Sequence, residues 1–206
     1  MLNIANLECV RGDRQLFSDL SFAMDGGSLL HVHGANGSGK TTLLRAIAGL
    51  VLPEAGAIQW NGVSTRKLGE DFNRELLYLG HHDGLKFELT GYENLNIFAR
   101  LSGFNISARQ VEVALKRMGL ARCVELPVKV LSQGQKKRVA LARLLLQPAR
   151  LWILDEPFVA LDVAAVSLLL ELIQQHVADG GMVILTTHQA VDVDVGQLQH
   201  LHLGEH

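Results

Sequence analysis

Short apolar runs alternate with stretches of helical periodicity over much of this chain. Residues 29–32, 151–154 and 182–185 are short, largely apolar runs, and a helical stretch precedes the second and the third. Runs of this length that are apolar on both faces are typical of central strands in a parallel sheet. The alternation of such strands with helices predicts an α/β fold.

The N-terminal part follows a different pattern, in which apolar positions alternate with polar ones. Breaks fall at residues 12–13 (Gly-Asp) and 26–27 (Gly-Gly), and residues 57–62 form a further strand pattern with an Asn-Gly turn at its end. We therefore expect strands joined by turns. The repeating apolar residues are Leu2, Ile4, Leu7, Leu16, Leu20 and Phe22.

Between residues 90 and 146 the apolar spacing becomes helical, with breaks at Gly103, Gly119 and Pro127. No repeat, low-complexity segment or linker separates this block from the rest of the chain. We interpret it as a helical insertion into one α/β domain that spans residues 1–206.

The first central run leads into a glycine-rich loop. From Gly34 to Thr41 the sequence fits the G-x-x-x-x-G-K-[ST] pattern of the phosphate-binding P-loop. Residues 41–50 then have helical spacing, so the loop ends at a helix N-terminus, where free N–H groups favour phosphate oxygens. The expected apolar face of that helix comprises Leu43, Leu44, Ile47 and Leu50.

Two side chains of this loop have specific expected roles. Lys40 should reach the β- and γ-phosphates, and the Thr41 hydroxyl should hold Mg²⁺. The predicted nucleotide-binding residues of the loop are Gly34, Ala35, Asn36, Gly37, Ser38, Gly39, Lys40, Thr41 and Thr42.

Two further motifs follow the other central runs. Asp155 and Glu156 are adjacent at a strand end, and successive strand residues point to opposite sides, so we expect Asp155 to join Thr41 at Mg²⁺ and Glu156 to face an attacking water. His188 follows the last central run, at the strand ends where open parallel sheets bind ligands. We expect His188 to donate a hydrogen bond to the γ-phosphate. Lys40, Glu156 and His188 form the predicted catalytic set.

Composition and charge exclude several classes of function. The chain has 206 residues and a formal net charge of −2, which argues against a general nucleic-acid surface. Cys9 and Cys123 lack metal-ligand spacing, which fits free thiols in a reducing compartment. No signal-peptide pattern is visible, and no uncharged run approaches the roughly 20 residues that span a bilayer. We expect a soluble chain that contacts a membrane only through partners and binds no nucleic acid.

Five motifs in this order resemble the nucleotide-binding subunits of ABC transporters. They are the P-loop, LSQGQ at 131–135, WILDEP at 152–157, VALD at 159–162 and TTH at 186–188. The resemblance covers essentially the whole chain. It implies a P-loop NTPase with a RecA-like core, an N-terminal antiparallel β-subdomain and a helical subdomain at about residues 85–146. It also implies an ATPase with ATP and Mg²⁺ as cofactors.

The same resemblance implies an active site shared between two copies of the chain. The P-loop and the signature of one chain would lie too far apart to share one ATP, which implies a head-to-tail dimer with ATP between the copies. Asp162 would lie in the D-loop between them. The signature residues that would act on the nucleotide of the second copy are Ser132, Gln133, Gly134 and Gln135.

A narrower resemblance rests on GHHDGLK at 80–86, LTGYENL at 89–95, WILDEPF at 152–158 and TTHQ at 186–189. These stretches resemble the CcmA family, the ATP-binding subunits of the haem exporter in bacterial cytochrome c maturation. This resemblance implies a complex with the membrane subunit CcmB, and with CcmC and CcmD, at the cytoplasmic face of the inner membrane. ATP hydrolysis would serve haem export or the release of the haem-loaded chaperone CcmE.

Three other functions stay open at this point. The chain would suit another ABC exporter, for lipids, drugs or polysaccharide. A soluble ABC protein that acts on DNA or ribosomes is disfavoured by the single ATPase unit, the lack of a long heptad run and the lack of basic excess. A nucleotide-gated module that does not hydrolyse ATP is disfavoured by Glu156 and His188.

Three positions depart from the family pattern. Arg11 stands where most such ATPases place an aromatic residue against adenine; its guanidinium can lie flat on a base, and a solvated strand-end arginine is the alternative. His82 stands at the Q-loop glutamine, with His81 as the alternative, and is a further candidate Mg²⁺ ligand when neutral. ATPase activity should therefore fall below about pH 6.5. Gln133 replaces a glycine, whereas Gly134 is kept.

The nine histidines raise the question of a metal or haem site. His200 and His202 alternate with leucines, as on one face of a final strand, and His31 and His33 flank Val32. We expect His200 and His202 to face solvent, and none of these spacings is that of a haem site.

Overall fold

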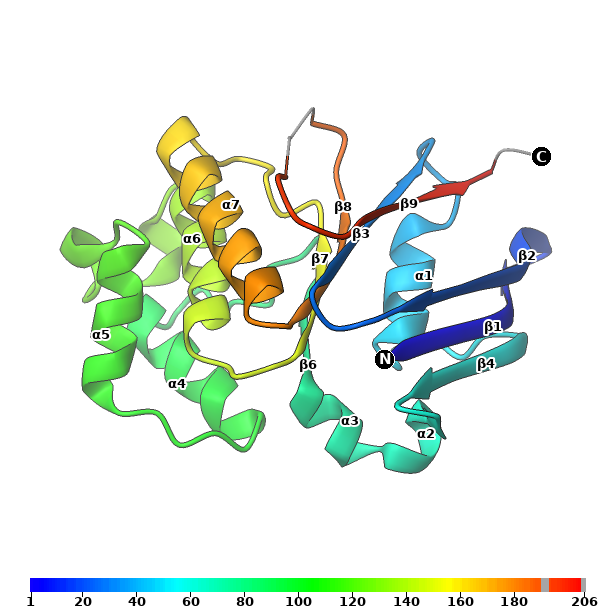
Figure 1. Ribbon diagram of the computed structural model, residues 1–206. Helices are drawn as coiled ribbons and strands as arrows, with labels where there is room; N and C mark the ends of the chain where they lie inside the picture. Colours follow the sequence, from blue (N-terminus) through cyan, green and yellow to red (C-terminus); the bar gives the residue numbers. More distant parts are fainter. Residues whose placement is uncertain (190–192, 205–206) are drawn as a thin grey trace.

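Two sheets form the framework of the protein, and the computed structural model describes residues 1–189 and 193–204. The strands of the antiparallel sheet, in spatial order, are β2 (Arg14–Met24), β1 (Leu2–Arg11), β4 (Ala55–Trp60) and β5 (Val63–Ser64). The strands of the parallel sheet, in spatial order, are β6 (Leu76–Leu79), β7 (Leu151–Asp155), β8 (Met182–Thr186), β3 (Ser28–Gly34) and β9 (Leu198–Leu203). The predicted α/β architecture with both sheet types is confirmed (Figure 1).

Turn chemistry explains the antiparallel sheet. Gly12 has a φ of 61° between β1 and β2, and both Asn61 and Gly62 have positive φ, 49° and 79°, between β4 and β5. Two successive residues with positive φ form the tight turns that match the twist of a hairpin. The turn predicted at residues 12–13 is confirmed because Arg11 pairs with Arg14 across it, and the turn at 61–62 is confirmed because Trp60 pairs with Val63.

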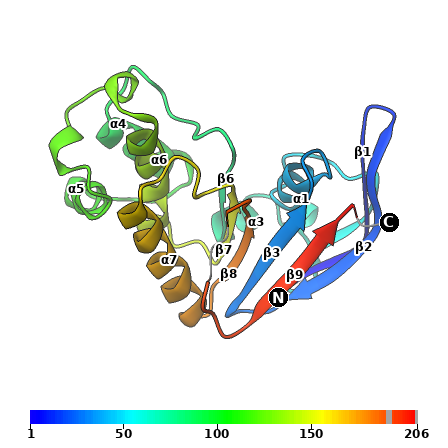
Figure 2. The same ribbon diagram turned by 90° about the horizontal axis from the view of Figure 1, so that it is seen from above.

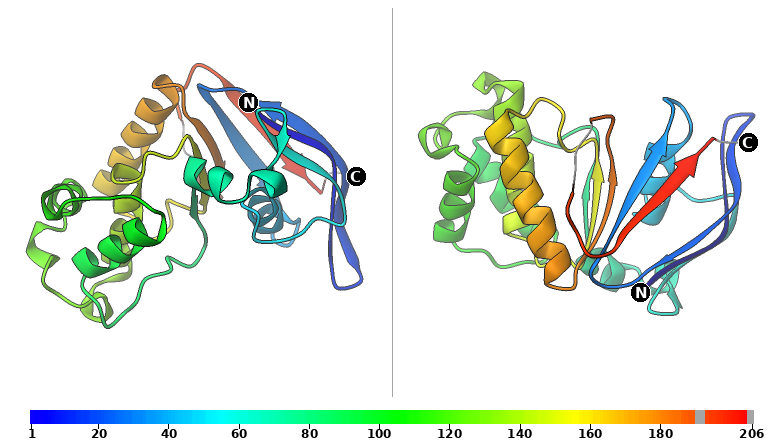
Figure 3. Two further views of the ribbon diagram at one scale, coloured as in Figure 1. Left: turned by 90° about the horizontal axis from the view of Figure 1, so that it is seen from below. Right: turned by 45° about the horizontal axis from the view of Figure 1, so that its top comes forward.

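Helices cover both faces of the parallel sheet. In chain order they are α1 (Lys40–Ile47), α2 (Thr65–Leu68), α3 (Glu70–Glu75), α4 (Gly91–Leu101), α5 (Ala108–Arg117), α6 (Gln133–Leu141) and α7 (Val163–Ala178), with 3₁₀ turns at Ala121–Cys123, Val128–Val130 and Ala142–Leu145. Helix α1 lies between the two sheets, whereas α4 to α7 lie on the other side of the parallel sheet (Figures 2 and 3). Among the described residues, every helix is too short or too polar to cross a membrane.

The helix expected at residues 41–50 is shorter than predicted. Gly49, at a φ of 74°, ends it: its N–H donates to Ala46 O, and the Leu50 N–H donates to Arg45 O. This pair of bonds is the glycine-dependent helix stop known as the Schellman motif. Leu50 is consequently 61% exposed instead of lying on the apolar face.

The core is split between the two faces of β3. Leu30 and Val32 belong to the cluster packed around α1, and Leu29 belongs to the cluster packed around α7. Because alternate strand residues face opposite sides, His31 and His33 lie on the face away from α1.

Candidate functional site

Residues 35–39 form a loop between β3 and α1 that only glycine permits at two points. Gly34 has a φ of 144°, and a Cβ there would lie 2.6 Å from Leu203 O. Gly39 has a φ of 103°, and a Cβ there would lie 3.1 Å from side-chain atoms of Leu16 and Phe17. A side chain at either position would strain the backbone, and at Gly34 it would also clash with the Leu203 carbonyl.

The loop presents an arrangement suited to an anion. Helix α1 begins at Gly39 without a side-chain cap, so its first N–H groups point into the loop without a competing acceptor from Gly39. Lys40 is only 9% exposed, and its Nζ donates to Gly34 O at 2.6 Å and to Ala35 O at 3.1 Å. Ser38 Oγ is buried without a hydrogen-bond partner. A buried ammonium beside free donors is a phosphate-type site.

A hydrogen-bonded set of side chains joins this loop to the ends of β7 and β8. The Asp155 carboxylate is buried and accepts from Thr41 Oγ1 at 2.9 Å and from Thr186 Oγ1 at 2.8 Å. The Glu156 N–H in turn donates to Thr186 Oγ1 at 3.0 Å. Thr186 thus fixes both acidic residues relative to each other, a role that the sequence did not reveal.

Glu156 and His188 face each other across the strand ends. Glu156 Oε1 lies 3.4 Å from His188 Nε2, and the His188 backbone N–H donates to Glu156 Oε2 at 3.3 Å. Glu156 has a φ of 51°, a conformation that costs energy for a residue with a side chain and that is typical of functional sites.

These groups line one cavity of about 540 Å³. Its lining holds the following residues singled out from the sequence: Arg11, Asn36, Gly37, Gly39, Lys40, Thr41, Thr42, Asp155, Glu156 and His188. The loop residues Gly34, Ala35 and Ser38 do not line it. His81 lines the cavity and His82 does not, so the geometry favours the alternative position for the Q-loop histidine.

Three lining residues were not assigned to the site from the sequence, namely Leu16, Val159 and Gln189. Val159 begins the VALD motif and Gln189 ends the TTHQ stretch, so both belong to recognised motifs but were given no role at the site. Leu16 carried only a strand pattern, so its place in the cavity follows from the packing of β2 against the loop.

The signature residues lie outside this cavity, at the start of α6. Ser132 Oγ accepts from Gln135 N at 3.2 Å, and the Gln135 side chain accepts from Ser132 N at 2.8 Å, which forms a capping box. A Cβ on Gly134 would lie 2.6 Å from Ala160 O. This close contact explains, within one chain, why residue 134 is a glycine, in addition to the expected close approach of a nucleotide. Gln133 is exposed.

Asp162 also has contacts within its own chain. It caps α7 by accepting from Ala165 N at 2.9 Å, and its other oxygen lies 3.9 Å from an Arg138 nitrogen on α6. Asp162 thereby links the loop after β7 to the signature helix.

The predicted Mg²⁺ ligands fit that ion. The Thr41 hydroxyl and the Asp155 carboxylate supply oxygen donors that already touch each other, and Mg²⁺ prefers oxygen ligands. The buried Ser38 hydroxyl without a partner lies in the same loop. The donor set therefore suits Mg²⁺ bound together with phosphate.

The chain is similar to ABC transporter proteins over most of its length. The family model described as ABC transporter matches residues 17–159. The "Cytochrome c biogenesis ATP-binding export protein CcmA" of Nitrosomonas europaea is 52% identical over 204 residues, which cover 99% of this chain and 96% of that protein. The protein of the same name from Dechloromonas aromatica is 52% identical over 204 residues, with 99% and 100% covered.

Solved structures show the same fold. A structure titled "Structure of ATP binding subunit of ABC transporter" has a TM-score of 0.82 at 31% identity and covers 91% of this chain and 79% of its own. A dimeric ATP-binding cassette in a post-hydrolysis state, bound to ADP and Pi, has a TM-score of 0.86 with 100% and 97% covered. Its identity is 22%, so it supports the fold alone.

Proposed function

The chain belongs to the ABC transporter family of ATP-binding subunits, within the group of relatives named CcmA, and we propose that its ATP hydrolysis drives haem export or release of haem-loaded CcmE. It is an ATPase coupled to transport, of the cytochrome c biogenesis type. The observation that carries the chemical part of the proposal is the bonded set of Thr41, Asp155, Thr186 and Glu156 beside the loop cavity.

The loop holds the triphosphate, and Lys40 exchanges the carbonyls of Gly34 and Ala35 for phosphate oxygens. Thr41 and Asp155 would hold Mg²⁺, which would neutralise charge on the phosphates. Arg11, at the cavity wall, lies against the base. A flat guanidinium offers the face that an aromatic ring offers elsewhere.

Glu156 acts as the general base, and His188 positions the water. Glu156 takes a proton from the attacking water while the oxygen of that water bonds to the γ-phosphorus. The bond from that phosphorus to the bridging oxygen breaks, and ADP and phosphate leave. The contact of 3.4 Å between Glu156 and His188 supports this division of roles, because both side chains converge on one point of the cavity.

A second copy of the chain completes each site in this proposal. Ser132, Gln133, Gly134 and Gln135 stand outside the cavity of their own chain, which supports a role toward the nucleotide of the partner. The two copies meet head to tail, with Asp162 between them. The chain then acts as a single domain, 1–206, whose helical subdomain spans about residues 85–146.

The membrane partners are CcmB, with CcmC and CcmD, and the ATPase lies at the cytoplasmic face of the bacterial inner membrane. Full-length similarity to proteins named for cytochrome c biogenesis export supports this placement. Membrane contact is made through those partners and not by the chain itself.

Gene replacement tests the proposal. A bacterium that makes c-type cytochromes carries Glu156→Gln in place of the native chain, and Glu171→Gln, an exposed acid on α7, serves as the matched control. We expect haem-stained c-type cytochromes to disappear with Glu156→Gln only, and CcmB to co-purify with both variants from solubilised membranes.

The state of CcmE separates the two forms of the proposal. Haem-loaded CcmE that accumulates would assign ATP to its release, whereas CcmE without haem would assign ATP to haem export. Normal c-type cytochromes in the Glu156→Gln strain would overturn the biogenesis role and favour another ABC exporter.

A further inference from the structure

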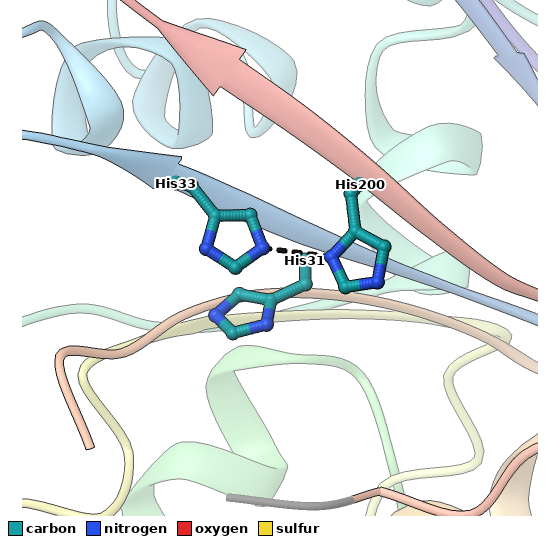
Figure 4. A group of neighbouring side chains, drawn as sticks. All are labelled: His31, His33 and His200. Atoms are coloured by element: carbon teal, nitrogen blue, oxygen red, sulfur yellow. Dashed lines mark hydrogen bonds between the residues drawn. The ribbon is translucent and has the colours of Figure 1, made fainter. Parts of the chain in front are cut away.

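Four histidines meet on one face of the parallel sheet, outside the lining of the nucleotide cavity. Strands β3 and β9 pair in parallel, with His31 opposite His200 and His33 opposite His202. Their spacing of two places all four on the same face. Figure 4 shows the rings of His31, His33 and His200 converging from the two strands.

Three of these rings are close enough to share one ion. His33 Nε2 and His200 Nδ1 lie 2.8 Å apart, and the rings of His31 and His33 are 3.8 Å apart between centroids. One ring nitrogen from each of His31, His33 and His200 lies within 4.8 Å of the others.

The polar groups of this cluster are incompletely satisfied. His31 Nε2 is buried and has no hydrogen-bond partner. Burial, together with His33, lowers the pKa of His31 to about 4, and burial also lowers the pKa of His33, with His202 and His200 adding to the effect. Burial thus favours the neutral form of both side chains, and neutral imidazole is the form that binds metals.

We propose that His31, His33 and His200 form a binding site for a borderline transition-metal dication of the Zn²⁺ class. Zn²⁺ binds imidazole nitrogens at about 2.0–2.1 Å, which places tetrahedral ligand atoms roughly 3.3 Å apart. That separation falls between the 2.8 Å and 4.8 Å found here, so small side-chain rotations suffice. His200 is exposed, which leaves the fourth position to water.

The ligand atoms distinguish this site from the Mg²⁺ site. Thr41 and Asp155 offer only oxygen, whereas the histidine cluster offers only imidazole nitrogen. Mg²⁺ prefers the first set, and Zn²⁺, Ni²⁺ or Cu²⁺ prefer the second.

A bound ion would tie the edge strand β9 to the strand that carries the P-loop. His33 directly precedes Gly34, and β9 pairs with β3 as far as Gly34. Only the folded chain brings residues 31, 33 and 200 together, so binding stabilises the folded state by mass action.

Metal titration of the untagged, EDTA-treated chain tests the proposal. Zn²⁺ competes with a chromogenic chelator, and Co²⁺ reports the ligand geometry by its visible absorption. We expect one Zn²⁺ per chain, a tetrahedral Co²⁺ band and a higher melting temperature with Zn²⁺. His200→Gln should weaken Zn²⁺ binding about tenfold or more and remove the Co²⁺ band.

His202→Gln is the matched control, since it makes the same change on the same exposed strand, two residues away. It should keep the affinity of the original chain. His33→Gln provides a second ligand variant, and circular dichroism verifies that each variant is folded. Equal affinity in the original chain and His200→Gln, or equal loss in His200→Gln and His202→Gln, would overturn the three-histidine site.

Discussion

The P-loop side and the signature side of this chain are built in different ways. On the P-loop side, Thr41, Asp155, Thr186 and Glu156 are joined by hydrogen bonds of 2.8–3.0 Å that link β7, β8 and α1. On the signature side, the side chains of Ser132 and Gln135 form a capping box at the start of α6, and the Gln135 amide also contacts Cys123 Sγ. The first side is a preorganised pocket, and the second is a helix start that lies outside it.

This difference indicates a division of labour between copies. A pocket whose groups already bond to one another can bind nucleotide within one chain, because little ordering is needed. A capped helix N-terminus outside the pocket contributes only when another surface is brought to it.

The largest effect is expected on the P-loop side, for Thr186→Val. The change leaves the buried Asp155 carboxylate and the Glu156 N–H each without one partner. We expect the free energy of unfolding to fall by about 2–3 kcal/mol and turnover to fall about tenfold or more. Urea unfolding and phosphate release measure the two effects. Thr186→Ser keeps the hydroxyl and should retain most of the stability and most of the turnover. If it loses both, the methyl group of Thr186 and not its hydroxyl is what matters.

An intermediate effect on turnover should distinguish two capping boxes that have the same geometry. Ser107 with Gln110 begins α5 in the way that Ser132 with Gln135 begins α6. Ser107→Ala and Ser132→Ala should each lower the free energy of unfolding by about 1 kcal/mol. Only Ser132→Ala should also lower ATP turnover, while leaving nucleotide affinity intact. Parallel denaturation and steady-state assays test this, and similar turnover in both variants would contradict a role of Ser132 at the nucleotide.

The smallest effect concerns stability in acid and should leave ATP binding and turnover, on the P-loop side and the signature side, unchanged. His176 stacks on Trp152 at 3.8 Å, and burial lowers its pKa. The unfolded chain therefore binds protons that the folded chain does not, so the free energy of unfolding decreases as the pH falls below about 6.5. His176→Gln should flatten this loss between about pH 7 and pH 5. Thermal melts across that range measure stability against pH for both chains. Equal slopes for the original chain and His176→Gln would show that His176 does not cause the loss.

Local patterns predicted much of this molecule. Strands β7 and β8 were readable as short apolar runs, and the P-loop as a strand, a glycine pattern and a helix. The end of α1 was missed because the apolar spacing reaches Leu50, although Gly49 carried the stop signal. Element type followed from periodicity, and element ends depended on single glycines.

Contacts between distant segments were not predictable in this way. The side-chain contact between His33 and His200 depends on the register of β3 with β9, which no local pattern specifies. His200 and His202 are exposed as expected, but the shared face with His31 and His33 emerged only from the sheet. The clash that keeps Gly134 a glycine likewise depends on Ala160, in another loop.

Each nucleotide site, as we propose, binds ATP within one chain but needs a second copy of the chain for hydrolysis. Glu156→Gln should bind ATP while turning over about a hundredfold more slowly, because the general base is lost. Light scattering of this variant measures whether ATP brings two copies of the chain together. We predict that its molecular mass doubles when ATP and Mg²⁺ are added and returns to the monomer value with ADP. A variant that binds ATP fully and stays a monomer at every protein concentration would show that no second copy completes the site.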